Sequence, residues 1–266
     1  MNIFWHEIRA HWKGLIGWSI GILITIVSGM AKFEGYSATG TNSINQLISS
    51  FPKPLMAVFG MTGLDLTKLI GYFGVLYLYV VLVVAIHAGL LGAEVIAEEE
   101  RDKTSEFLFA KPVSRINVMT QKLLAALVNI LIVFGVTVAS SIWIVDFYNK
   151  GSSLDSQVMM LMWGVLLFQL LSFAFGIFFA GVFRRPKMPA TAVTVVILTS
   201  YIISVIAVLN TNLDFLNNLT PFWYFGAPKI IADGHLDPFY VTVSSALIIA
   251  MIMTSYLVYN KRDLKV

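Results

Sequence analysis

The segment EEERDKTSEFLFAKPVSRINVMTQK, residues 98–122, is a charged stretch between two long apolar stretches. This segment holds ten charged residues, whereas the whole chain has 18 basic and 15 acidic residues. The apolar sequence before it, from Gly71 to Ala93, and after it, from Leu123 to Val145, is each long enough to cross a bilayer as a helix. This arrangement predicts an all-α, polytopic membrane protein whose charged loop contacts something soluble.

Composition supports the membrane class over the whole chain. The 266 residues are 58% hydrophobic and only 12% charged, with a mean hydropathy of +0.80, whereas soluble domains carry about 25% charged residues. The spans need all of this length, so we expect one transmembrane domain over residues 1–266. The chain has no cysteine, which excludes disulfides and cysteine-bound metals.

Six segments have the length of a membrane span, roughly 20 apolar residues. They are Gly14–Met30, Gly71–Ala93, Leu123–Val145, Val158–Val182, Met188–Leu209 and Tyr240–Tyr259. The first apolar run is too long for a signal peptide, so we expect it to be retained. In residues 1–13, Trp5, Ile8 and Trp12 recur at helical spacing beside basic residues, which predicts a helix lying in the membrane interface. The alternative is that residues 1–13 only begin the first span.

The distribution of basic residues predicts the orientation. If both termini, residues 98–122 and residues 184–187 lie on one side, that side holds 13 of the 18 Lys and Arg residues. By the positive-inside rule, this side is cytoplasmic. The same bias accounts for the net charge of +3 without a nucleic-acid partner.

The segment between the fifth and sixth spans is rich in aromatic residues. Thr220 is a natural N-cap and Pro221 a natural first helical residue, and a second break follows at Gly226–Pro228. This pattern predicts two short helices that dip into the outer leaflet. Its candidate gate residues are Pro221, Phe222, Trp223, Tyr224 and Phe225. The alternative is an aromatic belt that only anchors a loop.

The second span has a polar face and a small-residue face. Four residues fall within a stripe of about 80° at helical spacing: Tyr72, Tyr79, His87 and Glu94. The opposite face carries Gly71, Gly74, Ala85, Gly89 and Gly92. Because small residues allow close helix contact in lipid, we expect this second face to pack inside the bundle. The polar face would then meet a polar cavity or a partner subunit.

Thr194 and Tyr201 of the fifth span complete the candidate transport pathway. Each assignment has a simpler alternative. His87 is equally explained as a hydrogen-bonded interior histidine, and Glu94 as an interfacial carboxylate paired with Arg or Lys. Hydroxyl groups in spans often bond only their own backbone.

Motifs for enzyme chemistry are absent. The chain contains no G-x-x-x-x-G-K-[ST] phosphate loop, no H-E-x-x-H zinc motif and no G-x-S-x-G nucleophile motif. The histidines His6, His11, His87 and His235 are scattered without ligand spacing. We therefore expect no catalytic residue, no metal and no cofactor bound by this chain.

The charged segment resembles the first cytoplasmic loop of ABC-2 type permeases, the membrane subunits of type V ABC transporters. The matching positions are Glu100, Thr104, Glu106, Leu108, Pro112, Val113, Ser114, Arg115 and Lys122. Lys103 departs from the usual glycine, and Phe109 from the common second leucine. The six-span layout and the segments Pro54–Gly60 and Thr220–Phe225 extend the resemblance over the chain.

The resemblance implies that Thr104–Phe109 is a coupling helix that docks on an ATP-binding subunit. Its apolar side chains Phe107 and Leu108 have charged flanks, which suits rigid docking. The candidate coupling residues are Glu100, Thr104, Glu106, Phe107, Leu108, Pro112 and Arg115. The alternative is a loop that binds lipid head groups, although an anionic leaflet would repel the acidic run at residues 98–100.

By the same resemblance, the chain is the permease subunit of an ATP-driven exporter in the plasma membrane of a bacterium. ATP and Mg²⁺ would bind two separate ATP-binding subunits, and a second permease copy or a paralogue would complete the pathway within membrane lipid. The aromatic and apolar spans favour a hydrophobic or amphipathic substrate, such as a peptide or antimicrobial. Alternatives are a sodium or drug efflux permease, an ATP-independent carrier or channel, and a membrane anchor or sensor that signals through the same ATPase.

Overall fold

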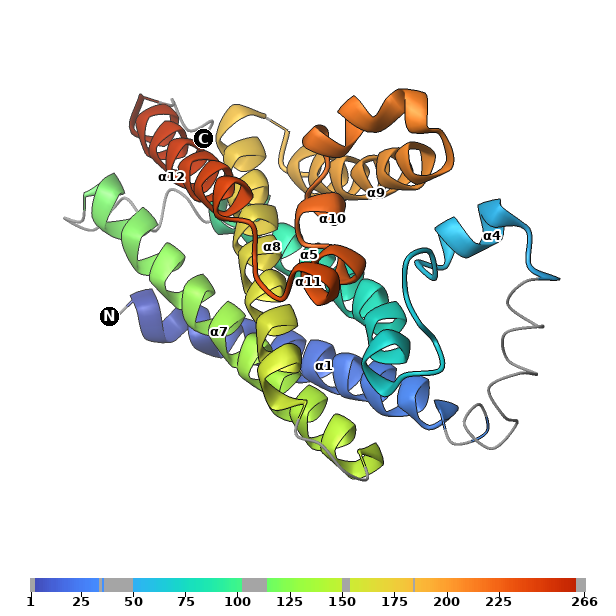
Figure 1. The fold of residues 1–266 in the computed structure, drawn as a ribbon. Coiled ribbons are helices and arrows are strands. Elements are labelled where there is room, and N and C mark those ends of the chain that lie inside the picture. The colour runs from blue at the N-terminus through green and yellow to red at the C-terminus, as the bar shows by residue number, and fades with distance from the viewer. Residues whose placement is uncertain are drawn as a thin grey trace.

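The computed structural model describes residues 3–33, 35, 50–101, 114–149, 154–183 and 185–261, without the side chains of residues 98–101, 211 and 261. Six long helices dominate this part of the chain (Figure 1). They are α1 (Ile3–Met30), α5 (Leu69–Arg101), α7 (Arg115–Tyr148), α8 (Asp155–Val182), α9 (Met188–Leu209) and α12 (Pro238–Lys261). All six are long and apolar enough to cross a membrane, which confirms the predicted all-helical, six-span fold.

The helices extend beyond several of the predicted spans because polar residues continue them. α7 begins at Arg115 rather than Leu123, since the Ser114 hydroxyl caps it by accepting a hydrogen bond from the Asn117 backbone N–H at 3.2 Å. α1 runs from Ile3 without a break at Gly14, because a single helical glycine costs only about 1 kcal/mol. The interfacial position of its first residues stays a prediction.

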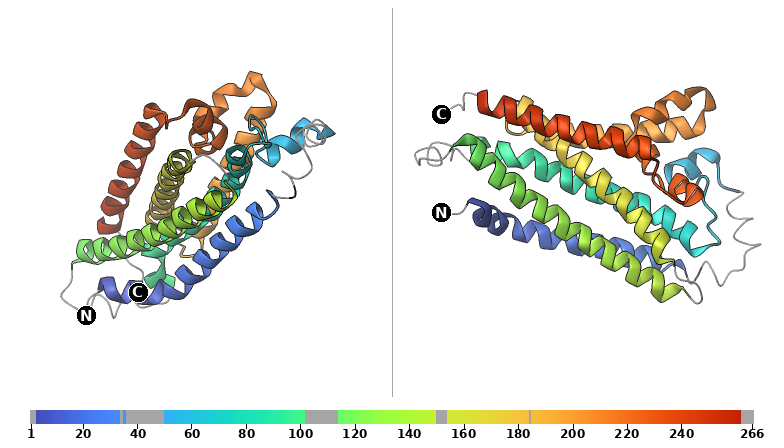
Figure 2. Two further views of the ribbon diagram at one scale, coloured as in Figure 1. Left: turned by 60° about the horizontal axis from the view of Figure 1, so that its bottom comes forward. Right: turned by 60° about the vertical axis from the view of Figure 1, so that its left-hand side comes forward.

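The two ends of the bundle differ. The N-terminal end of α1, the C-terminal end of α12 and the two helix ends that flank residues 102–113 lie at one end, here called the terminal end (Figure 2). The short helices lie toward the opposite end. They are α4 (Lys53–Val58), the 3₁₀ helix η1 (Thr211–Leu219), α10 (Pro221–Tyr224) and α11 (Ala227–Asp233).

α5 and α8 form the centre of the bundle and are the most buried of the six spans. Their backbones touch: a Cβ added at Gly92 would lie 2.3 Å from the Phe173 carbonyl oxygen, and one at Gly176 would lie 2.2 Å from that of Gly89. The small-residue face of the second span thus packs inside the bundle, as its pattern predicts.

The peripheral helices surround this centre. α1 packs on α7 and α5, α9 on α5, and α12 on α8. Their outward faces carry apolar side chains that are more than half exposed, such as Ile24, Ile202 and Leu257. Such faces suit contact with lipid.

Candidate functional site

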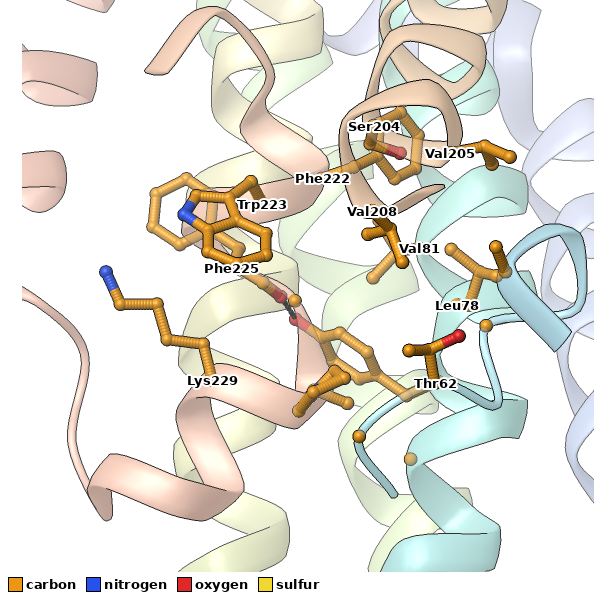
Figure 3. Close-up of a pocket in the computed structure, with 18 of the residues that line it drawn as sticks. Thr62, Leu78, Val81, Ser204, Val205, Val208, Phe222, Trp223, Phe225 and Lys229 are labelled. Carbon is orange, nitrogen blue, oxygen red and sulfur yellow. Dashed lines mark hydrogen bonds between the residues drawn. The ribbon is translucent and has the colours of Figure 1, made fainter. Parts of the chain in front are cut away.

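A cavity of about 540 Å³, here called the chamber, lies between the long helices and the short helices (Figure 3). Its walls come from α5, α8, α9, the residues around α4, and the segment from η1 to α11. The largest lining side chains are apolar or aromatic: Tyr77, Leu78, Phe168, Tyr201, Phe222, Trp223 and Phe225. Fewer polar groups join them: Thr62, Ser204, Asp214, Lys229 and Asp233. This volume and mixture are typical of small-molecule sites.

α10 forms one wall of the chamber, and α9 holds its start. Thr220 caps α10, since its Oγ1 accepts a hydrogen bond from the Phe222 N–H at 3.3 Å. The same Oγ1 donates to the Ser200 carbonyl oxygen at 2.9 Å and lies 2.9 Å from the Ser200 Oγ. The cap and the break at Gly226 agree with the sequence pattern.

The aromatic residues of α10 are docked on the long helices. The Phe222 ring makes edge contacts with Phe168 of α8 and Tyr201 of α9, at centroid distances of 4.6 and 5.4 Å. The Tyr77 hydroxyl of α5 donates to the Phe225 carbonyl oxygen at 2.8 Å. Three helices therefore hold this wall, and its movement as a gate stays a prediction.

A polar network ties the chamber wall to the start of α12. Lys229 Nζ lies 2.9 Å from Asp237 Oδ2 and 4.4 Å from the centre of the Tyr240 ring. Tyr240 stacks on Tyr224 at 4.2 Å, and its hydroxyl donates to Asn218 Oδ1 at 2.8 Å. The hydrogen bond from Lys229 holds the pKa of Asp237 below its usual value, and desolvation raises the pKa of Tyr224.

Two predicted pathway residues of α9 have different places. Tyr201 lines the chamber and donates its hydroxyl proton to the Val58 carbonyl oxygen, which links α9 to α4. Thr194 bonds the Ala190 carbonyl oxygen of its own helix at 2.9 Å, which is the simpler behaviour of a hydroxyl in a span. The structure does not bring Thr194 into the chamber.

The polar face of α5 meets α1. The Tyr72 hydroxyl donates to the Gly29 carbonyl oxygen at 3.1 Å, and the buried His87 ring lies 5.3 Å from the Trp18 ring. Tyr79, in contrast, is 36% exposed and does not line the chamber. The role of this face in transport stays a prediction.

At the terminal end, charged side chains gather between α1, α5 and α7. Glu7 lies 3.2 Å from Lys122 Nζ and 3.6 Å from His11 Nε2, and His11 Nδ1 lies 3.9 Å from Glu94. We name Glu7, His11, Glu94 and Lys122 the charged cluster. Among the described residues, no group of His, Asp and Glu has an arrangement that could hold a metal ion.

Sequence reasoning did not single out several of these residues. The spacing of Glu7 and His11, four residues apart on a helix, was an available signal. No signal identified Tyr77 as a chamber residue, because its partner Phe225 is 148 residues away along the chain. Lys229 of α11 pairs with Asp237, which lies eight residues later and directly before α12.

The predicted coupling helix cannot be placed. Thr104–Phe109 and Pro112 lie outside the described residues, as does the side chain of Glu100. Arg115 begins α7. The described helices therefore locate the two ends of this connection at the terminal end, and the coupling assignment stays a prediction.

Comparison with known proteins identifies the family of this chain. A search of curated proteins finds no match. Residues 1–264 match the family described as ABC-2 family transporter protein, which is nearly the full length of the chain. A match of this extent agrees with the six apolar helices, and the chain therefore belongs to the ABC-2 family of transporter proteins.

Proposed function

We propose that this multi-pass membrane protein is the permease subunit of an exporter that moves a hydrophobic or amphipathic molecule, driven by ATP hydrolysis on a separate subunit. ABC-2 permeases generally work with an ATP-binding subunit. The finer parts of the proposal are the direction of transport, the substrate class and the stoichiometry of two permeases with two ATP-binding subunits.

The observation that carries the substrate class is the chamber. Its largest walls are aromatic and aliphatic, while its polar groups are few and come mostly from the short-helix side. An apolar interior with a few polar groups favours a ligand that has a large apolar body and a small polar part. A fully hydrated ion would leave most of these walls without a suitable partner.

α5 supports the link between the chamber and ATP hydrolysis. It is one continuous helix from Leu69 to Arg101, about 50 Å long at 1.5 Å per residue. Tyr77, Leu78 and Val81 of this helix line the chamber, and its other end leads into the connection that contains the proposed coupling helix. A displacement of that connection by the ATP-binding subunit would reach the chamber through a rigid element.

The test is transport in liposomes that contain the permease with its ATP-binding subunit. Val208 lines the chamber and Ile206 does not, although both are partly exposed on α9. Val208→Trp should fill part of the chamber and reduce the transport of an amphipathic peptide by about tenfold, equivalent to about 1.4 kcal/mol. Ile206→Trp is the matched control and should retain transport.

Three results would contradict the proposal. Transport at the wild-type rate without the ATP-binding subunit would favour an ATP-independent carrier or channel. Equal transport by the Val208→Trp and Ile206→Trp variants would remove the chamber from the pathway. Copurification with the ATP-binding subunit, but no ATP-dependent movement of solute, would favour an anchor or sensor.

A further inference from the structure

Two members of the charged cluster, Glu7 and Lys122, are largely buried although they are ionisable. The side chains of Lys122 and Glu7 are only 5% and 12% exposed, and their charged atoms lie 3.2 Å apart. A buried charge that loses its partner is strongly destabilised, so each of these groups fixes the position of the other. α1 is thereby attached to α7 at a defined point.

The cluster also attaches α1 to α5. His11 lies one turn after Glu7 on α1, and its ring lies between Glu7 at 3.6 Å and Glu94 of α5 at 3.9 Å. A second contact reinforces the α7 side, since the Phe4 backbone N–H donates to Gln121 Oε1 at 3.2 Å. The first turns of α1 therefore bridge two helices that the chain connects only through residues 102–113.

The two attachment points are placed symmetrically. Glu94 lies about two turns before the end of α5 at Arg101, and Lys122 lies about two turns after the start of α7 at Arg115. Any force on the intervening connection enters the bundle through these two helix ends. α5 and α7 also contact each other directly in this region, and the bridge by α1 adds a charged attachment to that apolar contact.

We propose that Glu7 and His11 are positioning residues that join the flanking ends of α5 and α7, so that ATP hydrolysis moves both helices as one body. This inference rests on the proposed ATP-driven function. Neither residue touches the substrate, and both act through the helices that they hold. The expected consequence of breaking the joint is ATP hydrolysis without transport.

The main test is His11→Gln in the full chain with its ATP-binding subunit in liposomes. This change leaves the Glu7–Lys122 pair intact, so the protein should assemble normally. We expect the amount transported per ATP hydrolysed to fall about fivefold, the lower end of the usual range of coupling between distant sites. His6→Gln, an exposed change on the same helix, is the control.

A second variant separates positioning from simple stability. Glu7→Gln with Lys122→Met removes both buried charges and leaves no ion unpaired, so assembly and the thermal midpoint should match the wild type. Transport per ATP should nevertheless stay low. A wild-type ratio of transport to ATP hydrolysis in His11→Gln or in the assembled double variant would overturn the inference. Absence of ATP-dependent transport in the wild-type complex would instead contradict the proposed function.

Discussion

The two ends of the bundle use different chemistry to hold their helices. At the terminal end, the cluster centred on Glu7 and Lys122 buries opposite charges between three helices. Around the chamber, the wall is held by neutral hydrogen bonds such as Tyr77 to Phe225 and by aromatic contacts such as Phe168 with Phe222. The ion pair near the chamber, Lys229 with Asp237, is partly exposed.

This difference indicates different mechanical roles. Separating a buried ion pair leaves two uncompensated charges and is strongly unfavourable, which suits a joint that must stay rigid. A neutral hydrogen bond contributes about 0.5–1.5 kcal/mol and is more easily exchanged for another partner. The terminal end is therefore suited to receive force, and the chamber end is suited to rearrange around a substrate.

The contact between α5 and α8 connects the two ends of the bundle. A large side chain at Gly176 should disrupt this contact and have the largest effect of the changes predicted below. Gly176→Leu would drive a side chain into the Gly89 backbone, and we expect a loss of about 3 kcal/mol or more from overpacking. The folded yield in detergent and the thermal midpoint measure this effect.

Gly135 of α7 is the control, because a Cβ there meets nothing within 4 Å. Gly135→Leu should leave the yield unchanged or improve it, since leucine has the better helix propensity. Equal yields for the two leucine variants would mean that α5 and α8 do not touch as described.

The proposed mobility of the chamber wall can be tested with a reversible cross-link. The Ser200 and Thr220 hydroxyl oxygens are 2.9 Å apart, and the chain has no cysteine of its own. A disulfide formed after Ser200→Cys with Thr220→Cys should lower export by about tenfold or more, and reduction should restore it. Each single cysteine variant is a control. Undiminished export by the oxidised protein would exclude a gate at this point.

The contribution of the neutral hydrogen bonds can be measured at Tyr77. Tyr77→Phe removes the donor to the buried Phe225 carbonyl oxygen and should cost about 1–3 kcal/mol of stability, the cost of an unsatisfied buried acceptor. A fall in the thermal midpoint is the measurement. Tyr79→Phe on the exposed face of the same helix should have a smaller effect. A larger fall in the thermal midpoint for Tyr79→Phe than for Tyr77→Phe would contradict the assigned role of Tyr77.

The smallest expected effect is at the exposed ion pair. The pKa of Asp237 is lowered by Lys229 and by the Phe239 N–H, so the folded state favours the carboxylate. Its contribution is complete above the usual aspartate pKa of about 3.9 and is lost as the pH falls through the lowered folded value. The thermal midpoint of the wild type should therefore approach that of Asp237→Asn as the pH falls toward 3. If the thermal midpoints of the wild type and Asp237→Asn differ by the same amount down to pH 3, the stabilising contribution of the Asp237 carboxylate is contradicted.

Much of the fold could be predicted because apolar length decides which segments cross a membrane. Met188–Leu209 and the ends of the first and fourth spans, Met30 and Val182, agree with the observed helices. Local capping was equally readable, since Thr220 and Pro221 start α10 as their types predict. Residues 3–13 and the first predicted span form one continuous helix, α1, and whether its first residues lie in the membrane interface stays a prediction.

The candidate site was only partly readable. Tyr201, Phe222, Trp223 and Phe225 all line the chamber, because an aromatic segment beside a span end must pack on something. The chamber itself could not be predicted, because its walls come from segments far apart along the chain.

The sequence by itself determined the membrane class, the six helices, the small-residue face of α5 and the start of α10, because each depends on residues close together along one helix. Only the tertiary structure decided that α1 covers Tyr72 and His87, and that Glu7 meets Lys122. These partners are distant along the chain and are brought together only by helix packing. The positions of buried charges and of the chamber therefore depend on how the helices pack, which periodicity and composition do not encode.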